Sequence, residues 1–175
     1  MPHRLRVSLL IALVVAALVP ALPAGATPPT SYLYNLKNDY RDMACLAGRS
    51  GGSANLKVQT SQCVDAFTDQ YWRLDPAPGT ALGYYTLTNR ISGLCLGMDP
   101  NNTRNGDRAS MGNCSPGEYN PFVYWALDPT SLGDTFMLRN HWTQKCLVAL
   151  HPNGYATQFS CTPDYHDQWW HFVQR

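Results

Sequence analysis

The chain has 175 residues, with 13 Lys and Arg against 12 Asp and Glu, so its formal net charge is +1. This balance supplies neither the basic surface that nucleic-acid binding needs nor an acidic tail. Eleven of the twelve acids are Asp, and Glu118 is the single Glu. Abundant Asp, Gly, Pro and Asn with little Glu favours turns and strands over helices. We therefore expect an all-β protein that does not bind nucleic acid.

Residues 1–26 have the composition of a secretory signal peptide. Two arginines precede an apolar run of thirteen residues (7–19), Pro20 ends the run, and the small residues 24–26 fit a cleavage site. The run is too short for a membrane anchor, and no later stretch is apolar enough to span a bilayer. We expect cleavage after Ala26 and a secreted product of residues 27–175, in which eleven Lys and Arg face twelve acids.

Beyond the signal peptide, apolar and polar residues alternate with a period of two, which predicts short strands. The predicted strands are residues 32–38, 44–46, 56–60, 71–74, 84–88, 94–98, 109–113, 123–127, 135–139, 145–150, 156–160 and 169–173. Gly or Pro interrupts the pattern about every ten residues, so we expect no helix of three turns.

The same ordered pattern occurs three times in residues 27–175. An aromatic residue is followed by x-Leu-x-Asn, then by Cys-Leu, a second Cys and a terminal Trp. Leu36, Leu87 and Leu138 are 51 residues apart at both steps. A fixed period with ordered landmarks indicates a repeat architecture. We place three repeats, each of roughly 45–50 residues, in one domain, at about 32–75, 84–128 and 135–175.

Four short strands cannot bury their own apolar face, so the three units must share one core. We expect its centre to contain two Leu and the terminal Trp of each unit. These residues are Leu36, Leu46, Trp72, Leu87, Leu96, Trp125, Leu138, Leu147 and Trp170. Twelve short strands in three equal parts should close on themselves rather than leave exposed edges.

All six cysteines lie in the repeats, two in each unit. Six cysteines allow fifteen pairings in principle, and the repeat selects the set that stays within each unit. We expect the disulfides Cys45–Cys63, Cys95–Cys114 and Cys146–Cys161. Each would contribute about 3 kcal/mol in the chain-entropy model. No Cys-x-x-Cys or Cys–His spacing points to a metal site or a reactive thiol.

The ends of the units carry a further motif. The first and third units close with Gln70-Tyr71-Trp72 and Gln168-Trp169-Trp170, whereas the second closes with Val123-Tyr124-Trp125. Together with the Cys-Leu steps and paired cysteines, this pattern resembles the ricin B-type lectin domain family over essentially all of residues 27–175. The resemblance implies a β-trefoil with one disulfide in each repeat and a carbohydrate ligand. It also implies, in each repeat, a pocket with an Asp after Cys-Leu, an aromatic residue two before the second Cys, and Asn or Asp before Gln-x-Trp.

The third unit keeps most of these groups. Phe159 stands two residues before Cys161, where the ring that stacks on a sugar belongs. Asp167 and Gln168 supply polar groups of the kind that bind vicinal hydroxyls. The alternative interpretation is that Phe159 is an ordinary core or surface aromatic residue and that Gln168 only ties strands together.

The Asp of the family is missing from the third unit, where Val148 occupies its place. We expect Asn153 and Tyr155, with His151 nearby, to be candidates for replacing it, because they lie in the loop that follows.

The other two units retain fewer groups. The first has Ala47 at the Asp position and Ser61 at the ring position, and the second has Gly97 and Gly112 there. Asp99 would face the same side of a strand as Gly97, but without a ring nearby. We expect neither unit to bind sugar.

Metal and catalytic sites have little support. Residues 99–107 place oxygen-bearing side chains at alternate positions, but Arg104 stands where a calcium loop needs Gly and Ser110 where it needs Glu. We interpret this segment as a polar turn and expect no metal or cofactor. No Ser-His-Asp order or paired-carboxylate motif emerges, so we expect no enzyme activity.

Our leading hypothesis is a secreted, non-catalytic carbohydrate-binding module that binds one sugar weakly, mainly through the third repeat. The alternative is a degenerate trefoil that binds a protein partner, as a secreted inhibitor or toxin-accessory subunit, because every unit lacks the Asp. Residues 49–55 and 99–108 would then be the contact loops.

Overall fold

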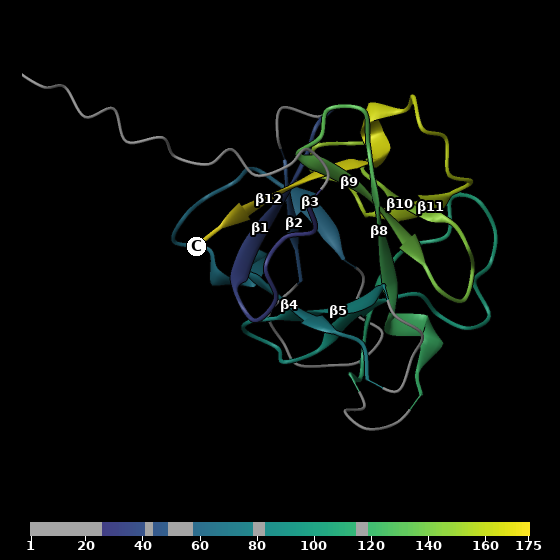
Figure 1. Ribbon diagram of the computed structural model, residues 1–175, viewed down its shortest axis with the longest axis horizontal. Coiled ribbons are helices and arrows are strands. Elements are labelled where there is room, and N and C mark those ends of the chain that lie inside the picture. The colour runs from purple at the N-terminus through teal and green to yellow at the C-terminus, as the bar shows by residue number, and fades with distance from the viewer. Residues whose placement is uncertain (1–25, 41–43, 49–57, 79–82, 115–118) are drawn as a thin grey trace, which may run out of the picture.

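The computed structural model describes residues 26–40, 44–48, 58–78, 83–114 and 119–175, so the predicted signal peptide lies outside them except for its last residue. The described residues form twelve strands and three single-turn 3₁₀ helices (Figure 1). The strands are β1 (Leu33–Asn38), β2 (Cys45–Ala47), β3 (Gln59–Ser61), β4 (Trp72–Pro76), β5 (Tyr84–Asn89), β6 (Cys95–Gly97), β7 (Ser110–Gly112), β8 (Trp125–Pro129), β9 (Thr135–Asn140), β10 (Cys146–Val148), β11 (Thr157–Phe159) and β12 (Trp169–Gln174). The helices are η1 (Thr68–Gln70), η2 (Pro121–Val123) and η3 (His166–Gln168). Each predicted strand is present with shifted ends, although residues 56–57 of the third lie outside the described residues.

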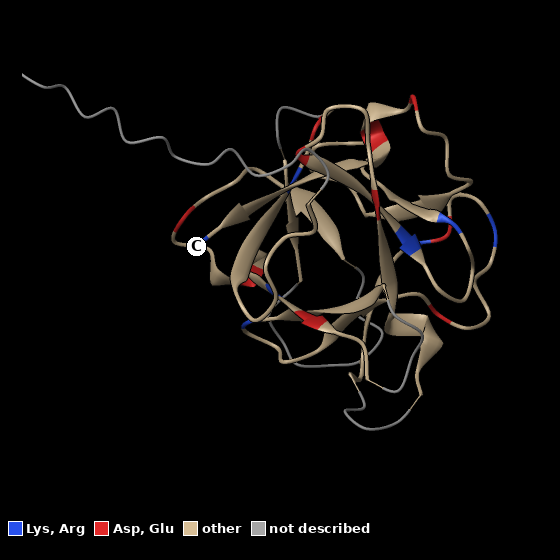
Figure 2. Ribbon diagram, viewed as in Figure 1, with Lys and Arg blue, Asp and Glu red and all other residues tan. Residues whose placement is uncertain are grey.

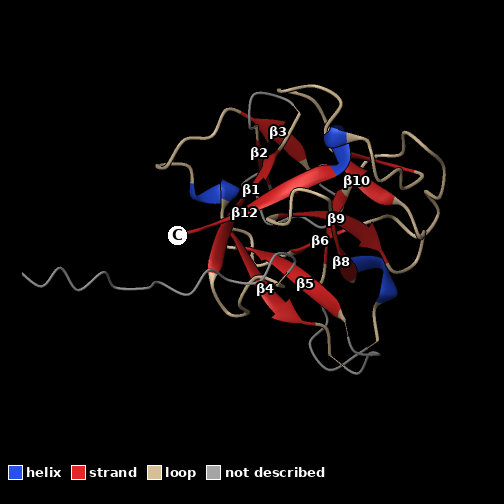
Figure 3. Ribbon diagram, turned by 45° about the horizontal axis from the view of Figure 1, so that its top comes forward, coloured by secondary structure: helices blue, strands red, loops and turns tan. Residues whose placement is uncertain are grey.

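Six of these strands close into a barrel. β1 pairs with β4 and β12, β5 pairs with β4 and β8, and β9 pairs with β8 and β12, all antiparallel. The remaining strands form one hairpin in each unit: β2–β3, β6–β7 and β10–β11. In Figure 3 the strands surround the centre and the 3₁₀ helices lie toward the outside. The predicted all-β trefoil is confirmed, and closure leaves the barrel without a free edge.

The three hairpins are joined by a ring of backbone hydrogen bonds. The Val58 N–H donates to Ala109 O at 3.1 Å, Ala109 N–H to Ala156 O at 2.9 Å, and Ala156 N–H to Val58 O at 2.9 Å. Buried backbone groups need such partners. Because each unit supplies a partner for another, a single unit would leave these groups unpaired.

The predicted core is confirmed. All nine expected Leu and Trp residues belong to one cluster and are fully buried. The terminal Trp of each unit donates its indole N–H to the carbonyl of the Cys-Leu leucine, at 2.9, 2.9 and 3.1 Å for Trp72, Trp125 and Trp170. The Trp therefore satisfies its polar nitrogen while its rings fill the centre.

The three disulfides join the predicted partners. Cys45–Cys63, Cys95–Cys114 and Cys146–Cys161 are formed, and the described residues contain no free cysteine. Each ties the start of the second strand of a unit to the segment beyond the third strand. The segments that they fix lead into η1, η2 and η3.

A buried asparagine marks each seam, by which we mean the contact between the 3₁₀ helix of one unit and the turn after the first strand of the next. Asn38 Nδ2 donates to Asp167 O at 2.9 Å, Asn89 Nδ2 to Asp69 O at 2.7 Å, and Asn140 Nδ2 to Phe122 O at 2.9 Å. Each amide oxygen accepts an N–H of the following turn. Asn38 thereby ties the first unit to the third.

The described charged residues are spread over separate strands and loops (Figure 2). Arg139 of β9 donates from Nε and Nη2 to the Asp128 carboxylate of β8, at 2.6 and 3.0 Å. This two-point ion pair joins the second and third units. In the part of the chain that the structure describes, no helix has the length and apolar character needed to cross a membrane.

Candidate functional site

Strand β11 places Phe159 at the predicted ring position. Phe159, Ser61 and Gly112 each pair opposite the first cysteine of their own unit. The three positions are therefore structurally equivalent, as the spacing predicts. An aromatic ring stands at this position in the third unit alone.

Phe159 lines a hollow that we call the inner pocket. Its volume is about 350 Å³. Its lining residues are Asn105, Leu150, Phe159, Ser160, Thr162, Tyr165, Asp167 and Gln168. Three of the five predicted site residues, Phe159, Asp167 and Gln168, are thus brought to one cavity. An aromatic wall with a few polar groups in a cavity of this size is typical of a small-ligand site.

Gln168 is buried beneath this pocket and holds its wall in place. Its Nε2 donates to Ser160 O at 3.0 Å, and its Oε1 accepts the Thr162 N–H at 2.9 Å. Gln70 makes the same kind of contacts in the first unit, from Nε2 to Gln62 O and from Val64 N–H to its Oε1. The Gln of this motif therefore shapes the loop after the third strand.

The polar turn of the second unit contributes Asn105 to the lining of the inner pocket. Gly106 N–H donates to Gln158 O at 2.8 Å, and Gln158 N–H donates to Asp107 O at 2.9 Å. Asn105 Oδ1 accepts the Ser160 N–H at 3.0 Å, which places Asn105 beside the pocket. The carboxylates in this turn accept backbone N–H groups, as a polar turn requires. Among the described residues, no group of three or more His, Cys, Asp or Glu is placed to hold a metal ion.

Asn153 and Tyr155 lie away from the inner pocket, on the hairpin that joins β10 to β11. The Tyr155 ring lies against the Arg108 guanidinium, 3.8 Å from the ring centroid, and its backbone bridges to Gln59. Neither Asn153 nor Tyr155 lines the cavity that Phe159 lines, and His151 does not line it either. Val148, at the family's Asp position, is 1% exposed. The structure therefore does not bring these loop residues to the cavity that Phe159 lines.

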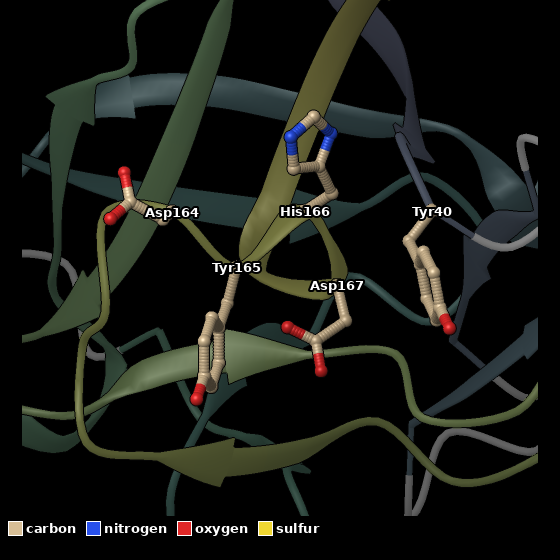
Figure 4. A pocket seen from close by; sticks show the side chains of 5 residues that line it. All are labelled: Tyr40, Asp164, Tyr165, His166 and Asp167. Carbon is tan, nitrogen blue, oxygen red and sulfur yellow. The ribbon is translucent and has the colours of Figure 1, made fainter.

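A second hollow, which we call the outer pocket, adjoins the inner one. Its volume is about 410 Å³, and it is lined by Tyr40, Asp164, Tyr165, His166 and Asp167. In Figure 4 the rings of Tyr40 and Tyr165 lie on either side of the Asp167 carboxylate, and the His166 ring points the other way. Sequence reasoning missed both tyrosines. Tyr165 lies two residues before Asp167, so its place beside the motif could have indicated it. Tyr40 comes from another unit, and no local signal connects it to the site.

The seam beside the outer pocket is fixed by charge as well as by Asn38. Asp39 Oδ2 lies 2.7 Å from His166 Nδ1, and Asp39 Oδ1 lies 2.8 Å from His171 Nε2. Burial acts to raise the pKa of Asp39, but hydrogen bonds and charge from His171 and His166 outweigh it, so the pKa falls below its ordinary value of 3.8. The carboxylate therefore stays ionised and holds η3 and β12 against the turn that carries Tyr40.

Comparison with known families agrees with this architecture. A family model described as "Ricin-type beta-trefoil lectin domain-like" matches twice, over residues 25–111 and 68–159. The chain belongs to the ricin-type β-trefoil lectin family. No curated protein matches it.

Solved structures show the same fold as this family member at low identity. A designed three-fold symmetric protein, ThreeFoil, is 22% identical, with 81% of this chain and 97% of that chain covered and a TM-score of 0.67. A Polyporus squamosus lectin bound to Neu5Acα2-6Galβ1-4GlcNAc is 14% identical, with 85% and 50% covered and a TM-score of 0.67. An exo-β-1,3-galactanase from Clostridium thermocellum is 18% identical, with 84% and 31% covered and a TM-score of 0.69. The chain thus spans half of that lectin and about a third of that enzyme, and the family match supports a carbohydrate-binding module.

In this family member the second unit has no room for the family's pocket. A Cβ on Gly97 would lie 2.9 Å from Val123 Cγ1 and 3.1 Å from Phe122 O, and one on Gly112 would lie 3.2 Å from Val123 Cγ1. Val123 occupies the place of the motif Gln and fills the space that an Asp and a ring need.

The first unit lacks the groups that the family's pocket needs. Ala47 is buried at the Asp position, and Ser61 at the ring position accepts a hydrogen bond from Gln70 Nε2 at 3.0 Å. Within the described residues, the third unit alone combines a ring with a cavity at this place.

Proposed function

We propose that the protein is a secreted, non-catalytic lectin that binds glycans mainly through the inner pocket of its third unit. The observation that carries this proposal is the position of Phe159 on one wall of a cavity that Asp167 and Asn105 also line. An aromatic ring can stack on the apolar face of a sugar, while carboxylate and amide groups bind its hydroxyls.

Weak binding follows from the chemistry of the pocket. The position that holds an Asp in the family is occupied by the buried Val148, so one charged acceptor is missing. A hydrogen bond to a charged group contributes roughly 1.5–3 kcal/mol, which is about a ten- to hundredfold difference in affinity. The module therefore depends on its aromatic contact more than a family member with the Asp does.

The test is a glycan array probed with residues 27–175 and with the variant Phe159→Ala. We expect retention on one class of glycan by the unmodified protein and its loss in the variant. Phe67→Ala is a matched control, because Phe67 is an exposed phenylalanine of the first unit, 54% accessible. Both variants must keep three disulfides and an unchanged melting temperature.

The neighbouring structures suggest which glycans to print first. Galβ1-4GlcNAc forms part of the glycan in the Polyporus squamosus lectin, and a β-1,3-galactan is the substrate class in the name of the Clostridium thermocellum enzyme. Retention that is equal for the unmodified protein and Phe159→Ala would reject the inner pocket. If the folded protein retains no glycan, the lectin proposal is rejected and a protein partner becomes the favoured ligand.

Secretion has a separate test. Expression of the full chain in a secreting bacterium should yield a product in the medium that begins at Thr27, read by N-terminal sequencing. The three disulfides suit an oxidising compartment. A product that keeps residues 1–26 would contradict the assignment of a signal peptide.

A further inference from the structure

We infer that the glycan site continues from the inner pocket across the seam into the outer pocket, so that the protein binds at least two adjacent neutral sugar residues of an oligosaccharide. This inference rests on the proposed function. Tyr40 of the first unit would provide specificity for longer glycans, as a contact to the second sugar.

The first support is that the two hollows share a wall. Tyr165 and Asp167 line both the inner pocket of about 350 Å³ and the outer pocket of about 410 Å³. A ligand that leaves the inner pocket past Tyr165 therefore enters the outer one. Each volume lies at the lower end of the range for small-ligand cavities, so the pair suits two sugar residues better than one.

The second support is the chemistry of the outer pocket. Tyr40 is 53% exposed and Tyr165 is 58% exposed, and their rings flank a carboxylate (Figure 4). Two tyrosine rings in one hollow combine apolar faces with polar hydroxyl groups, a combination that is enriched at binding surfaces. Asp164 and Asp167 are the acidic lining residues, and they favour hydroxyl donors and disfavour anionic sugars. A neutral oligosaccharide therefore fits better than a sialylated one.

The third support is that the backbone segments that carry the two rings are held in place before any ligand arrives. Asn38 accepts the Tyr40 N–H at its Oδ1, at 3.2 Å, and donates from Nδ2 to Asp167 O, at 2.9 Å. One fully buried amide thus fixes the backbone of Tyr40 relative to that of Asp167. On the other side, Tyr165 N–H donates to Thr162 O, and Gln168 N–H donates to Tyr165 O, both at 3.0 Å. Preorganised contacts lose less entropy on binding.

The other two seams lack this arrangement. Two residues after the seam asparagine, the first-to-second seam has Ile91 in place of Tyr40, facing a hollow with Phe67 and Asp69. The second-to-third seam has Trp142, whose ring packs edge-on against Phe122 with centroids 5.1 Å apart. Of the three seams in the described chain, the third-to-first seam alone has a carboxylate between two exposed aromatic rings.

The experiment measures affinities for a monosaccharide and for its extended forms. Residues 27–175 are titrated with galactose, Galβ1-4GlcNAc and Neu5Acα2-6Galβ1-4GlcNAc, and with whichever mono- and disaccharide pair the glycan array identifies. We expect the unmodified protein to bind the neutral disaccharide more tightly than the monosaccharide. Tyr40→Ala should weaken disaccharide binding about two- to tenfold, the value of one aromatic contact, and leave monosaccharide binding unchanged.

Two variants serve as controls. Tyr40→Phe keeps the ring and should bind the disaccharide as the unmodified protein does, and Ile91→Ala changes the equivalent residue of another seam and should have no effect. Equal binding of the disaccharide by the unmodified protein and Tyr40→Ala would overturn the inference while the lectin proposal stands. Loss of monosaccharide binding in a folded Tyr40→Ala protein would also overturn it, because the two pockets would then be one. Absence of all glycan binding would overturn both proposals.

Discussion

The second and third units have the same strands, the same disulfide and the same buried Trp, yet they differ at the pocket. In the third unit Gln168 holds the loop through hydrogen bonds, and Phe159 stands beside a cavity. In the second unit Val123 replaces the Gln, and its Cγ1 lies where a side chain at position 97 or 112 would have to begin. The apolar side chain of Val123 thus fills the space of the pocket in the second unit, and the fold stays the same.

The comparison shows that the residues of the pocket can differ between units while the core of the trefoil stays the same. The Trp and Leu residues are fully buried in all three units, whereas the groups around each cavity differ from unit to unit. Three variants, Gln168→Ala, Gly97→Ala and Asp39→Asn, test whether the core tolerates changes around the pockets and seams, and we expect their effects to decrease in that order.

The largest effect should come from Gln168→Ala. It removes both hydrogen bonds that shape the inner pocket and leaves Ser160 O and Thr162 N–H without their partner. We expect the free energy of unfolding to fall by about 2 kcal/mol, as measured by urea denaturation, and glycan retention to be lost. Gln70→Ala is the matched control, with a similar loss of stability and unchanged retention. Loss of retention in both variants would show that general stability, rather than pocket shape, governs binding.

A smaller effect is expected from Gly97→Ala in the second unit. The new Cβ would meet Val123 Cγ1 at 2.9 Å and Phe122 O at 3.1 Å, so the backbone or Val123 must shift. The melting temperature should fall, with a cost of about 1–2 kcal/mol, and glycan retention should stay unchanged. In a Val123→Ala background the cost of the same change should be smaller. If Gly97→Ala is tolerated without cost, Val123 does not close the second pocket.

The smallest effect concerns pH at the third-to-first seam. The folded pKa of Asp39 lies below its ordinary value of 3.8 because His171 and His166 hydrogen-bond to its carboxylate. The folded state therefore releases this proton more readily than the unfolded state. The resulting stability is complete above about pH 4 and is lost as the pH falls through the lowered pKa.

Urea denaturation at a series of pH values, compared between the unmodified protein and Asp39→Asn, measures this contribution. The difference between the two should shrink as the pH decreases below about 4. Asp134, which lies 3.6 Å from His171 Nδ1, remains in both proteins and cancels in the comparison. A difference that stays constant through this range would contradict the role of Asp39. The second and third units have Arg90 and His141 at the same position, so no acid there provides such a contribution.

Much of the site could be anticipated from local spacing. Phe159 and Asp167 do line one cavity, because both belong to a segment that a single disulfide, Cys146–Cys161, anchors. Whether they bind sugar stays a prediction, as does the signal peptide at residues 1–26. The proposed contact loop at residues 49–55 lies outside the described residues, and the loop at 99–108 is attached to β11 rather than projecting freely.

The expectation that Asn153 and Tyr155 complete the pocket shows the limit of spacing. Both are close to Phe159 in sequence, but the hairpin carries Tyr155 toward Gln59 and Arg108 instead, and Asn153 does not line the pocket either. Residues that do complete the two pockets, Asn105 and Tyr40, come from the second and first units. No local pattern could connect them, because their proximity arises only when the barrel closes.

The sequence by itself determined the repeat, the twelve strands, the shared core and the three disulfides. These follow from period-two alternation, from a recurring order of Leu, Cys and Trp, and from the need of each unit to bury one apolar face. The tertiary structure alone decided which pocket is open and what forms its walls. That outcome depends on contacts between units, such as Asn38 with Asp167 and Asn105 with Ser160, and on how one Val fills a space of a few ångströms.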